Sequence, residues 1–284
     1  MKNRNDYYDL SVLKAKIGNS LIYIILILYA LTTIYPFIWI ILTSLKSASE
    51  VYANPFGLPR IWEFGNYKQA LLGGNLLPSF LNSIFYSIIA TAIVILLSSM
   101  TAYILVRVYT KFIFYLYFTL GIMIPIPAII IPLFIIIKKL GLHNTRTGII
   151  LIYVVINLSF SIFILVSFMR NIPVELEEAA RIDGASLGRI FFNIILPIMR
   201  PGLATVGTFT FLFCWNDFLI ALVMAASPQL KTINLAVYNL RGMYSSDFGL
   251  ISAGVSWLVI PVMIMYVIFQ EQVVKGLTAG AVKG

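Results

Sequence analysis

Residues 149–169 read IILIYVVINLSFSIFILVSFM, a run without a charged side chain. A helix needs about 20 consecutive apolar residues to cross the hydrocarbon core of a bilayer, which is about 30 Å thick. The run is apolar throughout rather than alternating over about ten residues, which argues against a strand of a membrane β-barrel. This stretch therefore predicts a membrane-spanning helix.

The composition of the whole chain agrees with that prediction. Of the 284 residues, 60% are hydrophobic without counting glycine and 11% are charged, whereas soluble domains carry about 25% charged residues. One globular domain of this size cannot bury so much apolar surface. These values exclude a soluble enzyme and a disordered chain, and the single cysteine, Cys214, excludes a disulfide scaffold.

Five further apolar runs of similar length predict an all-α membrane protein with six transmembrane helices. Only the fifth run contains a charged residue, Asp217. The first run is longer than the 7–15 apolar residues of a signal peptide, so we interpret it as a retained anchor. The spans are expected near residues 21–42, 80–105, 112–137, 149–169, 203–226 and 250–269.

Three prolines, Pro125, Pro127 and Pro132, fall within the third predicted span. A proline removes a backbone donor and clashes with the preceding turn of a helix, so this span must kink. The kinked helix could be buried among its neighbours or could line a pathway, and the sequence alone leaves both interpretations open.

Six spans place both chain ends on the same side of the membrane. With the N-terminus inside, the cytoplasmic segments hold 12 of the 20 Lys and Arg residues, a bias that favours this orientation. We therefore expect a cytoplasmic N-terminal segment (1–20), a transmembrane domain (21–284) and, at the end of that domain, a cytoplasmic tail (270–284). The net charge of +9 is scattered over the loops, which indicates lipid headgroups rather than nucleic acid as the partner.

The sequence lacks the reactive groups of an enzyme. Its one histidine, His143, falls in a predicted outer loop, and no His, Cys, Asp or Glu cluster has metal-ligand spacing. Neither a G-x-S-x-G nor a G-x-x-x-x-G-K-[ST] motif occurs. We therefore expect no catalytic, metal or cofactor site in this chain, and energy has to come from a partner or an ion gradient.

The inner loop between the fourth and fifth spans, residues 170–202, carries the strongest local signal. Pro173 suits the first turn of a helix, and the glutamates after it would lie near the positive end of the helix dipole. Gly184 can adopt the left-handed conformation that ends a helix, and Ser186 can cap the next one. A cytoplasmic helix–glycine–helix elbow is predicted, either as a docking surface for a protein or as a plain loop.

This loop resembles the EAA motif of ABC importer permeases, with the family spacing kept and no insertion. The resemblance implies a MetI-like transmembrane domain in which the elbow is the coupling helix that fits a cleft on the ATP-hydrolysing subunit. The residues that would couple to the ATPase are Glu178, Ala179, Ala180, Asp183, Gly184, Ile194, Leu196 and Pro197.

Other segments resemble the carbohydrate-uptake subgroup of these permeases, and the C-terminal residues 270–284 resemble its MalG type. The matching segments are Tyr35-Pro36-Phe37, Ser44-Leu45-Lys46, Asn82-Ser83 and Trp215-Asn216-Asp217-Phe218. The resemblance implies a prokaryotic plasma-membrane assembly with a second, MalF-like permease chain, two ATP-binding subunits that hold ATP and magnesium, and an extracytoplasmic sugar-binding protein.

Asp217 is the one carboxylate inside a predicted span, about 21 Å along the helix from Leu203. Such a group is costly in the membrane and by default suggests a function. A continuous helix would place it on one face that runs from Gly207 to Met224. It could pack against the second permease chain, contact a sugar or relay a proton. The candidate pathway residues are Thr210, Cys214, Asn216 and Asp217.

The expected function is that of a permease subunit of an ABC carbohydrate importer, and two alternatives stay open. A permease for a polyol or a glycerol phosphate would favour Lys or Arg facing the pathway, and no predicted span contains one. An ion-coupled secondary carrier would need more intramembrane ionisable groups and usually internal repeats. We find one such group and no repeat.

Overall fold

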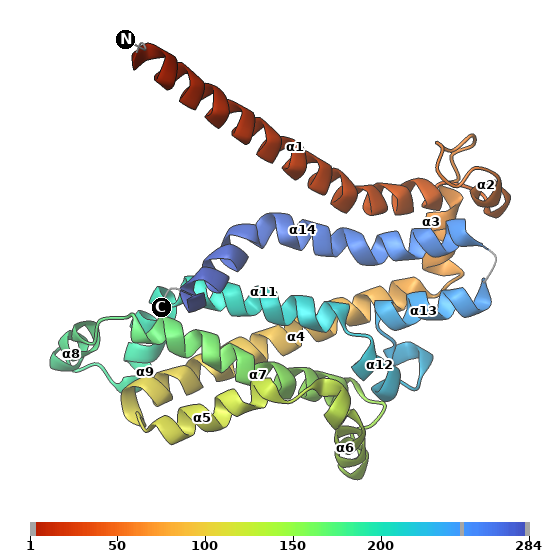
Figure 1. Ribbon diagram of the computed structural model, residues 1–284. Coiled ribbons are helices and arrows are strands. Elements are labelled where there is room, and N and C mark those ends of the chain that lie inside the picture. The colour runs from red at the N-terminus through yellow and green to blue at the C-terminus, as the bar shows by residue number, and fades with distance from the viewer. Residues whose placement is uncertain (1–3, 245–246, 282–284) are drawn as a thin grey trace. The chain divides into compact units, whose positions relative to one another are not determined.

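The computed structural model describes residues 4–244 and 247–281, which are mostly helical and contain no strand (Figure 1). Two compact units make up the fold. One is built from Met1–Ala70 and Tyr244–Ser256, and the other from Leu71–Met243 and Trp257–Gly284. The predicted all-α class is confirmed.

The first unit contains α1 (Arg4–Ser44), α2 (Ala48–Ala53), most of α3 (Gly65–Leu72) and the start of α14 (Phe248–Ala281). From Gly18 to Ser44, α1 is long and apolar enough to span a membrane. Its apolar side chains between Leu21 and Ile38 are exposed on all sides, as in a helix whose solvent is lipid.

The segment after α1 is organised around the buried side chain of Lys46. The Lys46 Nζ atom donates to the carbonyl oxygens of Asn54, at 2.7 Å, and Pro55, at 3.5 Å. The Trp39 indole also donates to the Pro55 oxygen, and the Asn66 amide donates to the oxygens of Ser44 and Lys46. The Ser44-Leu45-Lys46 segment therefore fixes the loop that follows the span.

The second unit is built on three long helices, α4 (Leu76–Tyr103), α7 (Arg146–Arg170) and α11 (Arg200–Asn216). Their facing side chains form the hydrophobic core, which includes Tyr86, Val94, Leu165 and Val206. The contact between α7 and α11 is close, because a Cβ atom on Gly202 would lie 2.8 Å from the Phe168 ring. The other segments of the unit pack around these three helices or connect them.

Those other segments are short or bent. They are η1 (Ile104–Val108), α5 (Phe112–Leu120), η2 (Gly121–Met123), α6 (Ile126–Lys139), α8 (Glu175–Ile182), α9 (Leu187–Ile190), η3 (Phe191–Ile195), α10 (Leu196–Ile198), α12 (Leu219–Met224), η4 (Pro228–Leu230) and α13 (Ile233–Met243). The segments η1 and η3 are π-helical turns, and η2 and η4 are 3-10 turns.

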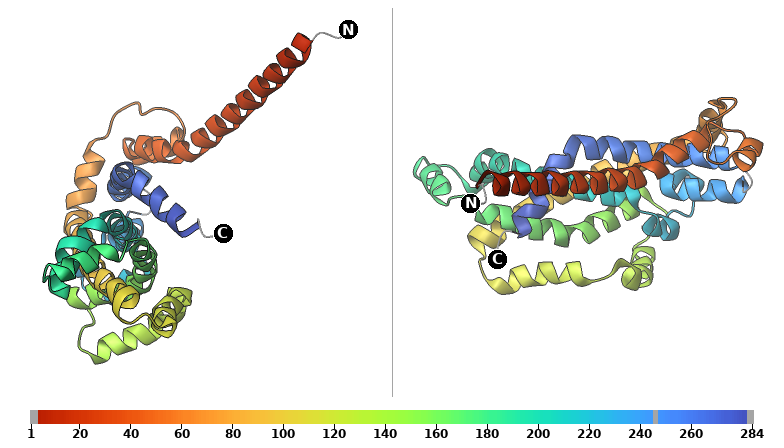
Figure 2. Two further views of the ribbon diagram at one scale, coloured as in Figure 1. Left: turned by 90° about the vertical axis from the view of Figure 1, so that its left-hand side faces the viewer. Right: turned by 45° about the horizontal axis from the view of Figure 1, so that its top comes forward.

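Four described helices are long and apolar enough to cross a membrane, and two bent pairs raise the possible number to six. Four of the predicted runs, 21–42, 80–105, 149–169 and 250–269, fall within the four helices, and the run 112–137 falls within the first bent pair. The second bent pair, 187–216, overlaps the predicted run 203–226 only in part. The kink predicted for the third span is observed as a sharp break, because α5–η2 and α6 meet at 102° (Figure 2). Ile124 and Pro125 are extended at this break. Ile124 precedes a proline, a position that disfavours helix.

The prediction of a continuous fifth helix over 203–226 is wrong. The helix α11 already begins at Arg200, 76° from the preceding segment, and ends at Asn216. Asp217 is extended, with φ −65° and ψ 132°, and α12 begins two residues later. Asp217 therefore does not share one helical face with Met224. An aspartate side chain offers backbone amides an alternative to the helix ladder, and that is what ends α11 here.

Candidate functional site

The helix–glycine–helix geometry predicted for the inner loop is observed. The helix α8 ends with Gly184 in the left-handed region at φ +78°. The amide of Ala185 donates to the oxygen of Ala180 at 2.9 Å, and that of Gly184 to the oxygen of Arg181 at 3.0 Å. This pair of bonds is a Schellman motif, which satisfies the last carbonyls of α8. Ser186 then caps α9 by accepting from the Arg189 amide.

The two faces of α8 differ in exposure. Glu177 and Ala180 are buried, at 1% and 9% exposure. On the other face Glu178 and Ala179 are exposed, and Ile182 is 87% exposed. The elbow therefore exposes an acidic, a small and a large apolar side chain on one face of α8, while the opposite face is buried against the rest of the unit.

Glu177 fixes the inner face of the elbow to the end of α4. One carboxylate oxygen accepts from the Tyr103 hydroxyl at 3.0 Å, and the other accepts from Arg107 Nε at 2.6 Å. The Arg107 guanidinium also donates to the Ile172 carbonyl oxygen at 2.6 Å. The Tyr103 ring packs against Phe191 of η3, with ring centroids 5.4 Å apart. Sequence reasoning missed this role of Glu177.

The second half of the predicted coupling set belongs to the bend that leads into α11. Ile194 and Leu196 are half-buried and pack against the core. Pro197 is exposed, as is Asp183 at the end of α8. The structure thus places Glu178, Ala179, Asp183 and Pro197 at the surface, while Ile194 and Leu196 hold the elbow against the helices of the second unit.

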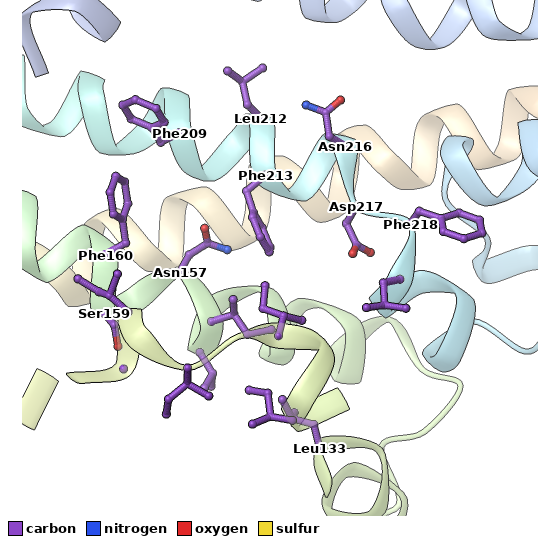
Figure 3. A pocket seen from close by; sticks show the side chains of 18 residues that line it. Leu133, Asn157, Ser159, Phe160, Phe209, Leu212, Phe213, Asn216, Asp217 and Phe218 are labelled. Atoms are coloured by element: carbon purple, nitrogen blue, oxygen red, sulfur yellow. The ribbon is translucent and has the colours of Figure 1, made fainter. Parts of the chain in front are cut away.

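A cavity of about 860 Å³ lies between α7, α11 and the bent segment η2–α6 (Figure 3). Its walls are mainly apolar and include four phenylalanines. The polar residues that line it are Asn157 and Ser159 from α7, with Asn216 and Asp217 at the end of α11. The break of the third predicted span at Ile124 and Pro125 borders this cavity, with Ile124 among its lining residues.

Asp217 braces the break between α11 and α12. Its Oδ1 accepts from the Ile220 amide at 3.1 Å, and its Oδ2 accepts from the Ala221 amide at 3.0 Å. The Oδ2 atom also accepts from the Tyr153 hydroxyl of α7 at 2.9 Å. The carboxylate therefore replaces the missing helix bonds at the start of α12 and connects this start to α7.

The other candidate pathway residues take different positions. Asn216 is exposed and points to the side of α11 opposite to Asp217 in Figure 3. Thr210 and Cys214 are buried at 1% exposure and are not among the cavity-lining residues. Asn157, which sequence reasoning did not single out, lines the cavity instead. An asparagine inside an uncharged span was the signal that could have identified it.

Residues 95–278 match the family described as "Binding-protein-dependent transport system inner membrane component". The match extends from α4 through the elbow and the cavity into α14. The chain belongs to this family of ABC importer permeases. The predicted resemblance is thereby confirmed, and the permease is a multi-pass protein of the prokaryotic plasma membrane.

Several relatives of the permease are named as permease proteins of sugar uptake or transport systems. It is 37% identical over 261 residues to "Diacetylchitobiose uptake system permease protein NgcG" of Streptomyces coelicolor, covering 90% of this chain and 86% of the relative. It is 36% identical over 253 residues to "Trehalose transport system permease protein SugB" of Mycobacterium tuberculosis, covering 88% and 92%. Both alignments cover most of the two chains.

A solved structure shares the fold of the permease. This structure is a chain of "a bacterial ABC transporter involved in the import of the acidic polysaccharide alginate", which aligns with a TM-score of 0.80 at 24% identity. The alignment covers 95% of this chain and 98% of that one. The permease therefore shares the fold of this ABC transporter chain.

Proposed function

We propose that this permease forms half of the translocation pathway of an ABC-type carbohydrate importer and couples it to a separate ATPase through the elbow. The observation that carries the proposal is the difference between the two faces of α8. Glu177 fixes one face to α4, and the other face exposes Glu178, Ala179 and Ile182. An exposed isoleucine beside a small side chain suits a protein contact better than water.

The proposed assembly contains a second, MalF-like permease chain, two ATP-binding subunits and an extracytoplasmic sugar-binding protein. ATP and magnesium would be held by the ATP-binding subunits. The family description, which refers to binding-protein-dependent transport, supports the binding protein. The uptake and transport systems named for the relatives support a multi-subunit importer.

Carbohydrate is the substrate class that the cavity supports best. Its lining combines phenylalanine rings with the amide of Asn157 and the carboxylate of Asp217. Such groups can contact both the apolar faces and the hydroxyl groups of a sugar. Of the described residues that line the cavity, none is Lys or Arg, which disfavours a glycerol phosphate. The names of the relatives, for diacetylchitobiose and trehalose, point the same way.

Orientation follows from the same proposal, because an elbow that meets an ATPase must be cytoplasmic. Both chain ends are then cytoplasmic as well. In a Cys214→Ala background, an impermeant thiol reagent added from outside should label Met243→Cys and should not label Tyr109→Cys. Both positions are exposed in the structure. External labelling of Tyr109→Cys would contradict the proposed topology.

The elbow itself is tested by Glu178→Lys and Ile182→Asp. Each change alters an exposed side chain without touching a span, so insertion and pairing with the second permease should persist. Co-purification should show capture of the ATPase weakened about tenfold or more, as for the loss of a strong interface contact. Sugar uptake into vesicles should fall with it.

Two further variants complete that experiment, one as a second test and one as a control. Gly184→Val should act like Glu178→Lys, because a Cβ atom at φ +78° costs about 1–2 kcal/mol and changes the angle of the elbow. Lys68→Glu, a charge reversal at an exposed position of α3, is the matched control and should leave ATPase capture intact. Normal capture and uptake in Glu178→Lys, Ile182→Asp and Gly184→Val would remove the coupling role from the elbow.

A further inference from the structure

The end of α4 far from the elbow is attached to the segment between α12 and α13. Asn82 Nδ2 donates to the carbonyl oxygens of Gln229, at 2.7 Å, and Lys231, at 3.2 Å. The Tyr86 hydroxyl donates to the Leu230 oxygen at 3.2 Å. Asn82 and Tyr86 are buried. We call these two residues the outer anchor.

The same helix carries a second attachment at its other end. Tyr103 and Arg107 hold the Glu177 carboxylate of the elbow, as described above. We call Tyr103 and Arg107 the inner anchor. Asn82 and Tyr103 are 21 residues apart in one continuous helix, a distance of about 31 Å along its axis. Figure 1 shows α4 running between the region of α12 and α13 and the region of α8 and α9.

Between the two anchors α4 is one continuous helix. Sharp kinks occur at prolines, at glycine or serine pairs that loosen the ladder, or at π-bulges, and no proline or glycine lies between Asn82 and Tyr103. The Ser98–Ser99 pair is buried, and both hydroxyls bond to carbonyls of the preceding turn of α4. The π-helical turn η1 begins only at Ile104. A displacement of one anchor is therefore passed along α4 to the other.

We propose that α4 connects the segment Gln229–Lys231 mechanically to the elbow, with Asn82 and Tyr86 as positioning residues for transport. The inference rests on the proposed function, since it takes the elbow as the contact with the ATPase. A partner that shifts this segment on one face of the membrane then changes the position of the elbow on the other. The Asn82-Ser83 motif, which the elbow and the cavity leave without a role, thereby receives one.

The experiment uses the complete transporter in proteoliposomes and measures ATP hydrolysis with and without the sugar-loaded binding protein. Tyr86→Phe removes one bond of the outer anchor, and Tyr103→Phe removes one bond of the inner anchor. Both changes keep the aromatic ring and its packing. Each should lower the stimulation by the binding protein about fivefold, within the usual range of coupling between sites. Asn82→Leu removes both Asn82 bonds to this segment, together with a bond that Asn82 accepts from Arg146, and should lower the stimulation at least as much.

The double variant Tyr86→Phe/Tyr103→Phe decides the question. If α4 is one serial connection, both variants weaken the same signal, so the double variant should lose much less than the product of the two single effects. Independent effects would instead multiply to about 25-fold. Such multiplication, or normal stimulation in Tyr86→Phe and Asn82→Leu, would overturn the proposal.

Asn144 supplies the matched control, because it bonds to the same segment between α12 and α13 but does not belong to α4. Its side chain bonds to the Ser227 amide at 2.8 Å and to the Ser227 hydroxyl at 2.6 Å. Asn144 has a positive φ of 56°, so Asn144→Gly removes the side chain without strain. In the double variant Asn144→Gly/Tyr103→Phe, the two losses of stimulation by the binding protein should multiply. Normal ATPase capture and uptake in Glu178→Lys would contradict the proposed function itself. Impaired capture in Glu178→Lys, together with effects of Tyr86→Phe and Tyr103→Phe on the stimulation that multiply, would contradict only the role of α4.

Discussion

Arg107→Met should release the elbow from α4 and expose it to protease. Glu177 would then be a carboxylate at 1% exposure without its cation. Breaking a buried ion pair by removing one partner costs about 3–5 kcal/mol. Local opening of the elbow should therefore become about 100-fold or more frequent. Tryptic cleavage after Arg181 and Arg189, both exposed on the elbow, should accelerate by a similar factor when cleavage follows the open population.

The double variant Arg107→Met/Glu177→Leu is the control for this result. It removes both charges and replaces them with apolar side chains, a change that is often nearly neutral in a buried pair. Its cleavage rate should fall well below that of Arg107→Met, although the Tyr103 hydroxyl and the Ile172 carbonyl oxygen also lose their partners. Cleavage of Arg107→Met at the original rate would show that the pair does not hold the elbow.

Asp217→Leu should destabilise the second unit of the permease severely. It leaves three donors without an acceptor: the amides of Ile220 and Ala221 and the hydroxyl of Tyr153. Each buried donor left unpaired costs about 1–3 kcal/mol, so the loss should reach about 3 kcal/mol or more. The melting temperature of the solubilised permease and its yield with the second chain measure this effect.

Asp217→Asn and Tyr153→Phe separate the roles open to this carboxylate. Asparagine keeps one accepting oxygen, and Tyr153→Phe removes one donor and its bond together, so both should be milder than Asp217→Leu. If Asp217 also contacts sugar, Asp217→Asn should raise the KM for uptake by more than Tyr153→Phe does. A pH-dependent uptake that disappears in Asp217→Asn would support proton coupling and contradict the brace.

Features that depend on local chemistry could be predicted from the sequence. Gly184 and Ser186 end one helix and begin the next through residues within a turn of themselves, and both predictions agree with the structure. The membrane-spanning helices could be predicted for the same reason, because a long apolar run is itself a local property of the sequence. The assignment of Glu178 to the ATPase contact stays a prediction, although its exposure is compatible with it.

Features that depend on distant partners could not be predicted. Glu177 and Glu178 are neighbours in one acidic turn, and only the position of Arg107, 70 residues earlier, makes Glu177 the buried one. Hydropathy also indicates which residues prefer the membrane, but it does not indicate where the backbone leaves the helical conformation. The break at Asp217 therefore remained hidden inside a continuous apolar run. The prolines of the third span showed that it bends, but not by how much.

On the segment between α12 and α13, the hydrogen bonds of the outer anchor go to main-chain oxygens, those of Gln229, Leu230 and Lys231. Every amino acid supplies a carbonyl oxygen, so this attachment is indifferent to the side chains at the three positions. The exposed Gln229 side chain can therefore be exchanged freely while the attachment stays intact. Under the proposed function, the surface that this segment offers to the binding protein can therefore change by substitution of exposed side chains, with no compensating change in α4.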